Sequence, residues 1–240
     1  MIRSISIVFP CYNEANRLKY TFKDIKKFQK KRIINNFEII FVNDGSSDDT
    51  FEILKNYKNR NTKLYKKIKI ISYQDNKGKG YALKEGIKIA KLDWILTIDT
   101  DISVSINQLN NWLKHKKIKK KETIYFGSRN LSNSNIKFKI YRKLVGIIFI
   151  KIIKIFFNIN LLDTQCGFKL YKKNIAKKLF TNLKILDFTH DIEIVLTSKK
   201  KGYKITELPV NWIHKKGSKI SIFKDSLKMF ISLLKIKFIF

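Results

Sequence analysis

The chain has 240 residues, 44% of them hydrophobic, which suits a folded domain with a proper core and excludes a disordered chain. Its 51 Lys and Arg against 19 Asp and Glu give a net charge of +32, which favours partners that carry phosphate. Two cysteines, Cys11 and Cys166, are too few for a disulfide framework or a cysteine metal site and predict a reducing, intracellular setting.

Short apolar runs alternate with helical patterns over the first half of the chain. Strands are predicted at residues 4–10, 37–42, 67–73, 93–98 and 123–127. Helices are predicted at residues 14–30, from 50 to about 57, from 80 to 91, and at about 106–115. Strands that are apolar throughout and alternate with helices are typical of a mostly parallel central sheet flanked by helices. The sequence therefore predicts an α/β fold.

Polar clusters follow four of these strands, at residues 10–14, 43–49, 76–80 and 99–101. Ligands of parallel α/β sheets bind outside the carboxyl ends of the strands. We therefore expect these four loops to place their side chains at one edge of the sheet and to form a binding site there.

After about residue 130 the pattern changes to two apolar stretches with lysines at helical spacing, at 141–158 and 220–240. Residues 144–157 would form a helix of about 21 Å, which is shorter than the ~30 Å core of a bilayer. Both stretches resemble amphipathic helices that lie in a membrane interface with Lys toward lipid phosphate. A core or dimer helix is the alternative. We predict a catalytic domain over 1–220, including the interface helix at 141–158, and a membrane-associating helix at 221–240.

Asp99 and Asp101 stand one residue apart, directly after the fourth predicted strand. Two clustered carboxylates are costly unless they are paired, and hard oxygen ligands suit Mg²⁺ or Mn²⁺. Such a metal would neutralise a diphosphate leaving group. The alternative is a solvated turn after a strand.

Other candidates carry weaker signals. Asp44 could accept hydrogen bonds from a base or ribose, or could be a turn residue. The glycine loop with Lys77 precedes a helix N-terminus and could lie near a phosphate. Arg129 and Arg142 could grip phosphate with a bidentate fork, or be surface cations. Asp191, at the start of a helical stretch, could be a catalytic base or an acceptor-binding group.

Seven stretches together resemble family 2 inverting glycosyltransferases of the GT-A (nucleotide-diphospho-sugar transferase) fold. They are VFPCYNE at 8–14, VNDGSSDDT at 42–50, NKGKGYALKEG at 76–86, DTD at 99–101, GSR at 127–129, DTQCGFKLY at 163–171 and PVNW at 209–212. The last two are similar to the dolichyl-phosphate β-glucosyltransferase branch and its polyprenyl-phosphate relatives. The resemblance covers about residues 1–220.

The resemblance implies roles for individual residues. The nucleoside pocket would be lined by Pro10, Tyr12, Glu14 and Asp44. The metal and the diphosphate would lie on Asp99 and Asp101. The substrate-binding set is completed by Lys77, Arg129, Arg142, Gln165 and Lys169, and the catalytic set consists of Asp101, Asp191 and Arg129.

The sequence departs from the family at three points. Asn43 replaces an acid that is common there, and Ser103 stands where a Gln helps to bind metal in some relatives. We also expect no N-terminal anchor of the kind that the eukaryotic glucosyltransferases carry, so membrane attachment would rest on the two amphipathic stretches.

We therefore expect a metal-dependent, inverting hexosyltransferase at the cytoplasmic face of a membrane, peripheral or monotopic. It would transfer glucose from UDP-glucose to a polyprenyl or dolichyl phosphate. The alternative is a family 2 enzyme that glycosylates a sugar hydroxyl of a surface polysaccharide, and a scaffold without activity is a third reading. No nucleic-acid partner is expected, because the aromatic residues fall in strands and apolar helices rather than among the basic residues.

Overall fold

The computed structural model describes residues 2–31, 33–119, 121–137, 150–215 and 222–240. Its strands are β1 (Ser4–Cys11), β2 (Asn36–Asp44), β3 (Ile68–Tyr73), β4 (Trp94–Thr97), β5 (Ile124–Ser128), β6 (Asn135–Lys137), β7 (Lys169–Lys172), β8 (Ile205–Pro209) and β9 (Asn211–Ile213). Its helices are α1 (Leu18–Lys31), α2 (Thr50–Arg60), the 3-10 helix η1 (Tyr65–Lys67), α3 (Lys79–Ile89), α4 (Asn107–Lys114), α6 (Lys173–Thr181), α7 (His190–Lys200) and α8 (Ile222–Ile239). Residues 150–157 are also helical. This alternation confirms the predicted α/β class.

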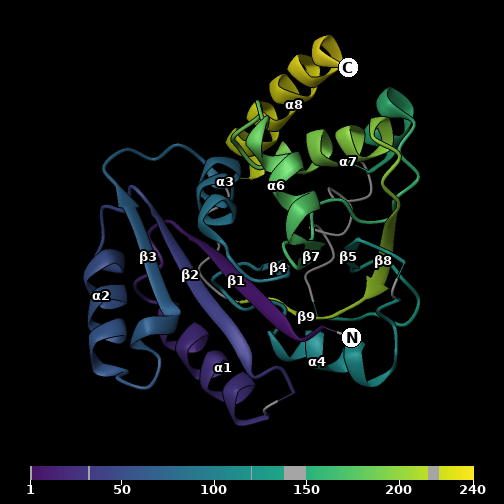
Figure 1. Cartoon of the computed structure of the whole chain (residues 1–240). Helices are drawn as coiled ribbons and strands as arrows, with labels where there is room; N and C mark the ends of the chain where they lie inside the picture. Colours follow the sequence, from purple (N-terminus) through teal and green to yellow (C-terminus); the bar gives the residue numbers. More distant parts are fainter. Residues whose placement is uncertain (1, 32, 120, 138–149, 216–221) are drawn as a thin grey trace.

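A seven-stranded sheet in the order β3-β2-β1-β4-β7-β5-β8 runs through the molecule (Figure 1). β1 pairs in parallel with β2 and β4, β2 with β3, and β5 with β8. In the described part of this sheet, β7 alone runs antiparallel to its neighbours, β4 and β5. A separate pair of short strands, β6 and β9, is parallel. The sheet is mostly parallel, as predicted, so the loops after β1, β2 and β4 meet at one edge.

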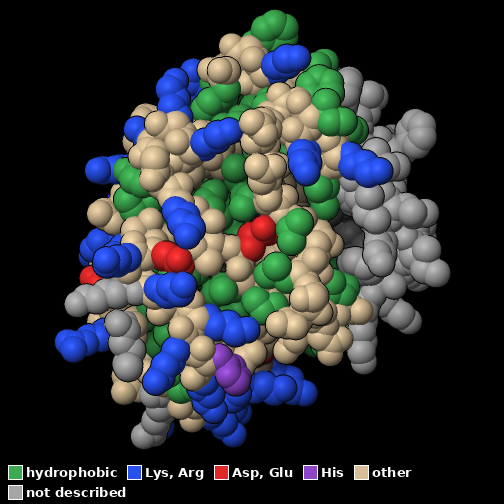
Figure 2. Space-filling model, turned by 90° about the vertical axis from the view of Figure 1, so that its right-hand side faces the viewer, with side chains coloured by type: hydrophobic (Ala, Val, Ile, Leu, Met, Phe, Trp, Pro, Cys, Tyr) green, Lys and Arg blue, Asp and Glu red, His purple; other side chains and the backbone are tan. Residues whose placement is uncertain are grey.

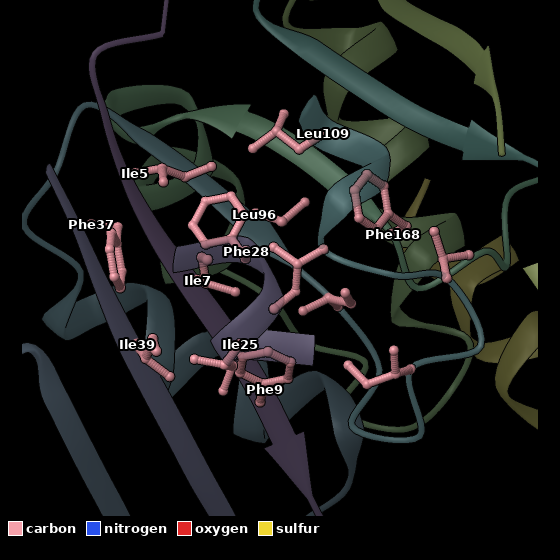
Figure 3. Packing of buried hydrophobic residues seen from close by; sticks show 14 of the residues in the cluster. Ile5, Ile7, Phe9, Ile25, Phe28, Phe37, Ile39, Leu96, Leu109 and Phe168 are labelled. Carbon is pink, nitrogen blue, oxygen red and sulfur yellow. The ribbon is translucent and has the colours of Figure 1, made fainter. Parts of the chain in front are cut away.

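Helices cover both faces of the sheet, because both faces of its central strands are apolar. Successive side chains of a strand point to opposite faces, and Ile7 and Val8 of β1 accordingly belong to different clusters of buried side chains. Figure 3 shows part of the first cluster, where Ile7 and Phe9 of β1 lie beside Ile25 and Phe28 of α1. The second cluster packs β1 and β2 against α3, α6 and α7.

Two predicted elements need correction. The first helix begins at Leu18 rather than at residue 14, because Asn13 has a positive φ of 52° and the Glu14 carbonyl accepts from the Arg17 and Leu18 amides in a turn. The strands predicted above end at residue 127, but the segment 163–171 leads into β7 in the middle of the sheet. Its neighbours β4 and β5 are remote in sequence, and local patterns do not report such pairing.

α8 lies at the top of Figure 1, next to α6 and α7. Leu233 and Ile236 are buried in the same cluster as these helices, while Phe238 on the other side of α8 is 92% exposed. No helix within the described ranges is long and apolar enough to cross a membrane. The predicted interface helix at 141–158 falls partly on residues outside the described ones, and its membrane role stays a prediction.

Gly86 lets α3 approach the sheet closely, and its replacement tests this packing. A Cβ atom at Gly86 would lie 2.4 Å from Val8 Cγ1 and 3.0 Å from Val42 Cγ2. We expect Gly86→Val to lower the free energy of unfolding by about 2 kcal/mol or more, because overpacked cores force neighbours to shift. Urea unfolding measures this, and Lys88→Val on the same helix, at an exposed site, is the control. Equal midpoints for the two variants would contradict the packing described.

Candidate functional site

The two acids that follow β4 lie on a tightly held turn. The Thr100 hydroxyl donates to the Pro10 carbonyl (2.7 Å), and the Thr21 hydroxyl donates to the Thr100 carbonyl (2.5 Å). Thr100 is buried between the acids, whereas the Asp99 and Asp101 side chains are 41% and 24% exposed. The turn therefore presents both carboxylates at the edge of the sheet, beside the loop that follows β1.

Each of these acids has a different cation as its neighbour. Lys79 Nζ lies 2.6 Å from Asp99 Oδ1, whereas Arg17 Nη1 lies 3.9 Å from Asp101 Oδ2. Burial raises the pKa of Asp99, but the charge and hydrogen bond of Lys79 outweigh burial and hold that pKa below its usual range. Burial and the negative charge of Asp99 raise the pKa of Asp101, although the Ser103 amide donates to it (2.8 Å).

The two acids could hold a divalent cation. Among the described residues, no three or more His, Cys, Asp or Glu side chains are grouped so that they could hold a metal ion. Asp99 and Asp101 would therefore supply one or two carboxylates, and other oxygens would have to complete the ligand set. Mg²⁺ is commonly held in this way, by one or two carboxylates together with substrate phosphates and water. The donor set thus fits a hard cation that binds along with a phosphate ligand.

Asp44, at the end of β2, accepts hydrogen bonds from the loop that precedes α3. Its carboxylate accepts hydrogen bonds from the amides of Lys77 (2.8 Å) and Gly78 (3.0 Å) and from Asn76 Nδ2 (3.0 Å). The amide of Gly80, in the first turn of α3, donates to the Leu186 carbonyl (2.7 Å). These groups are thus occupied within the protein, so the predicted substrate roles of Asp44 and Lys77 remain predictions.

The loop after β1 brings the remaining nucleoside-pocket candidates beside the acid pair. Tyr12 is exposed there, and Pro10 is tied to the acid turn by Thr100. Glu14 forms a two-point ion pair with Arg17. Burial nevertheless raises the pKa of Glu14 to about 7, although the charge and hydrogen bonds of Arg17 act in the opposite direction.

A second charged group lies beneath the acid pair. Lys169 Nζ is 2.6 Å from Asp191 Oδ1, and His190 Nε2 is 3.0 Å from the same oxygen, with all three side chains almost fully buried. Lys79, Asp99, Lys169 and Asp191 line one small pocket. Burial raises the pKa of Asp191, but His190 and Lys169 more than offset this, so the side chain is a carboxylate with a low pKa. Asp191 is therefore close to Asp99 but is already paired.

Arg129 is engaged by the segment that precedes β7. Its Nε and Nη2 donate to the two carboxylate oxygens of Asp163 (2.7 and 2.9 Å), and its own amide donates to Asp163 Oδ2 (2.9 Å). The amides of Gln165 and Cys166 donate to the same acid, each at 3.1 Å. Gln165 Nε2 is buried and lacks a hydrogen-bond partner within the described ranges. The other predicted arginine, Arg142, lies outside the described residues.

Sequence reasoning did not select three residues that the structure places at the acids. It chose Lys77 from the glycine loop, whereas Lys79 is the lysine that reaches Asp99. It also passed over Arg17, although the spacing of three between Glu14 and Arg17 is typical of a side-chain pair. A Cβ atom on Gly167 would lie 2.3 Å from Asp99 Oδ2, so this glycine makes room for the acid. That contact joins remote parts of the chain and leaves no local signal.

Comparisons with known proteins agree with this geometry. The chain matches the sequence family described as glycosyl transferase family 2 over residues 6–180. It is 33% identical to a dolichyl-phosphate beta-glucosyltransferase of Trichomonas vaginalis over 97% of this chain and 72% of that protein, and 31% identical to one of Dictyostelium discoideum over 98% and 74%. The crystal structure of glucosyl-3-phosphoglycerate synthase from Mycobacterium tuberculosis has a TM-score of 0.64 and 17% identity over 98% of this chain and 78% of that chain. The predicted GT-A fold and family resemblance are confirmed.

The Arg129–Asp163 pair should stabilise the fold. We expect Arg129→Met to lower the free energy of unfolding by about 3–5 kcal/mol, because it leaves the buried Asp163 carboxylate without its cation. Denaturant unfolding at neutral pH measures this loss. Arg60→Met, at an exposed position at the end of α2, is the control and should change stability by less than about 0.5 kcal/mol.

The same pair predicts a pH dependence. Burial raises the pKa of Asp163, but Arg129 and the backbone donors hold it below its usual range. Because the unfolded value is about 3.9, the stabilisation is complete above that pH and is lost as pH falls through the lower folded pKa. Asp163→Asn should remove this part of the acid dependence. An unchanged acid limb in that variant would contradict the assignment.

Proposed function

The chain belongs to glycosyl transferase family 2, and from that membership we propose that it transfers glucose from UDP-glucose to a polyprenyl or dolichyl phosphate at a membrane surface. The observation that carries this proposal is the pair of acids at the carboxyl edge of the sheet, with cations beside it, in a chain whose relatives are dolichyl-phosphate beta-glucosyltransferases. The structurally similar glucosyl-3-phosphoglycerate synthase was solved with Mn²⁺ and uridine diphosphate, which supports a uridine nucleotide donor in this fold.

We propose that Asp99 and Asp101 hold Mg²⁺ or Mn²⁺ together with the diphosphate of the donor. When bound, the metal would neutralise the charge that develops on the leaving diphosphate. The loops after β1 and β2, with Pro10, Tyr12 and Glu14, would bind the nucleoside. The Glu14 amide donates to the Thr50 hydroxyl (2.7 Å), and this hydrogen bond holds the two loops together.

The reaction is proposed to be a single displacement with inversion. An oxygen of the acceptor phosphate attacks the anomeric carbon of glucose, and the bond from that carbon to the diphosphate oxygen breaks. A phosphate monoester has a second pKa near ~6 and is already largely anionic at neutral pH. The chain therefore has no need of a strong base. Asp191 would orient a substrate hydroxyl or Lys169, and its pairing with Lys169 supports this role over proton abstraction.

The alternative acceptor is a sugar hydroxyl of a surface polysaccharide. A hydroxyl must lose its proton during the reaction, so this acceptor needs a base. In that case Asp191 would have to leave Lys169 and accept a proton. Burial raises the pKa of Asp191, but His190 and Lys169 lower it further than burial raises it, so this carboxylate is a weak base. The lipid phosphate therefore remains the favoured acceptor.

We propose that α8 and the helix at 150–157 form an apolar ridge that lies in the cytoplasmic face of a membrane. Lys237 Nζ lies 4.9 Å from the Phe156 ring, so the two helices lie side by side. Their exposed apolar side chains are Ile155, Phe156, Ile231, Leu234, Phe238 and Phe240. Exposed Lys151, Lys154, Lys235 and Lys237 accompany them. Hydrophobic side chains are visible at the top of Figure 2, above a face with many Lys and Arg. The apolar side chains of such a ridge would enter the bilayer, and its lysines would lie near the phosphates of anionic lipids.

Asp101 and Asp191 should differ in their effects on turnover. We expect Asp101→Asn to lower kcat/KM for glucose transfer to lipid phosphate by about 100-fold or more, because an acid of the proposed metal site is lost. Asp191→Asn should retain the shape of the wild-type dependence of kcat/KM on pH, since no proton passes to this side chain. Transfer of labelled glucose into lipid, measured with Mg²⁺ or Mn²⁺, tests both.

Asp191→Asn also leaves Lys169 without its anion, so this variant is assayed below its own melting temperature, determined by circular dichroism. If Asp191→Asn abolished transfer in folded protein while Asp101→Asn left it intact, the proposed division of roles would be wrong. Transfer to a polysaccharide hydroxyl, with no transfer to lipid phosphate, would instead establish the alternative acceptor.

The ridge predicts binding to lipid bilayers. We expect Phe238→Ser combined with Ile155→Ser to weaken binding to vesicles of phosphatidylcholine and phosphatidylglycerol by about tenfold or more, because burial of each large apolar side chain contributes about 1.5–3 kcal/mol. Sedimentation with vesicles measures it. Tyr65→Ser removes an exposed aromatic ring from η1, next to β3 at the other end of the molecule, and should bind as the wild type does. Equal binding by all three proteins would rule out the ridge.

A further inference from the structure

The backbone at Lys79 is held in place on both sides. Gly78 has a φ of +97° and its amide donates to Asp44 Oδ2, and a Cβ atom at Gly78 would lie 2.4 Å from the Leu186 carbonyl oxygen. The amide of Gly80 donates to that same carbonyl at 2.7 Å. Because the two glycines lack a Cβ atom, the start of α3 can lie in close contact with the segment before α7. Lys79 is fixed at a defined position and is not part of a free loop.

The side chain of Lys79 is directed into the site. It is 18% exposed, its Nζ lies 2.6 Å from Asp99 Oδ1, and it lines the same small pocket as Lys169 and Asp191. A lysine is ordinarily charged at neutral pH, and the carboxylates of Asp99 and Asp191 line the same pocket as this ammonium group. Lys88, on the same helix, is by contrast largely exposed and pairs with Glu85 at 3.8 Å.

Asp99 is also confined by Gly167. A Cβ atom there would lie 2.3–2.4 Å from all three atoms of the Asp99 carboxylate group. The Asp99 carboxylate therefore lies close to both the ammonium of Lys79 and the backbone of Gly167. Asp101 is less constrained, because Arg17 stays 3.9 Å away and the Ser103 amide engages one oxygen. The two acids of the pair are thus not equivalent.

We propose that Lys79 is a built-in counter-cation that holds the Asp99 carboxylate beside Gly167 and weakens metal binding to the acid pair. The inference rests on the proposed function, which places a divalent cation at these acids. A fixed positive charge beside Asp99 repels a second cation and competes with it for the carboxylate oxygen. Lys79 is in this sense a positioning residue, and one acid of the pair has a cation of the protein beside it before any metal arrives.

Metal affinity tests the proposal without any turnover. Mn²⁺ is titrated into the full chain, and free Mn²⁺ is followed by electron paramagnetic resonance. Lys79→Met should bind Mn²⁺ about tenfold more tightly than the wild type or better, because both carboxylates become available. Lys79→Arg should restore wild-type affinity, since it keeps the charge. Lys88→Met removes the same charge from an exposed site of α3 and should change the affinity by about twofold at most.

A gain of affinity separates this role from a structural one, because a disturbed site would bind Mn²⁺ more weakly. Melting temperatures check the fold, and Lys79→Gln, which keeps a polar group, should show the same gain if Lys79→Met unfolds. Unchanged or weaker Mn²⁺ binding by a folded neutral variant would overturn the proposal, as would absence of Mn²⁺ binding by every variant. Absence of glucose transfer together with the predicted gain would reject the proposed function but leave this inference standing.

Discussion

Repulsion between carboxylates at one edge of the sheet is the constraint to which the rest of the site is adapted. Asp99 and Asp101 lie just after β4, and Thr100 between them anchors their turn through two hydrogen bonds. Clustered acids in a partly buried site are costly unless positive charge is supplied nearby. Lys79 supplies it from the start of α3, and Arg17 supplies it from the turn before α1. The acids can therefore persist in the folded protein before any cation binds.

β7 and the segment before it connect this pair to the interior. The segment supplies Gly167 against Asp99, Asp163 for Arg129, and Lys169 for Asp191. The antiparallel strand between β4 and β5 places Gly167 and Lys169 beside Asp99. Arg129 is accordingly an organiser of this segment in the described structure, and its contact with a substrate phosphate stays a prediction.

α7 and α8 extend the same network toward the proposed membrane ridge. The Ser232 hydroxyl of α8 donates to Asp187 Oδ2 at 2.5 Å, and the Asp187 carbonyl is 2.7 Å from His190 Nδ1. His190 in turn contacts Asp191. A chain of polar contacts thus joins the helix with the exposed apolar residues to the buried pair below the acids. This arrangement allows the ridge and the site to be held in a defined relative orientation.

The sequence by itself determined the alternation of strands and helices, the parallel sheet, the family and the edge at which Asp99 and Asp101 lie. These features depend on local apolar periodicity and on short motifs, which neighbouring residues carry. Only the tertiary structure decided that β7 enters the sheet, that Lys79 rather than Lys77 meets Asp99, and that Asp191 is paired with Lys169. Each of these joins segments that are far apart along the chain. Ion pairing depends on distance in space, and periodicity along one segment does not encode it.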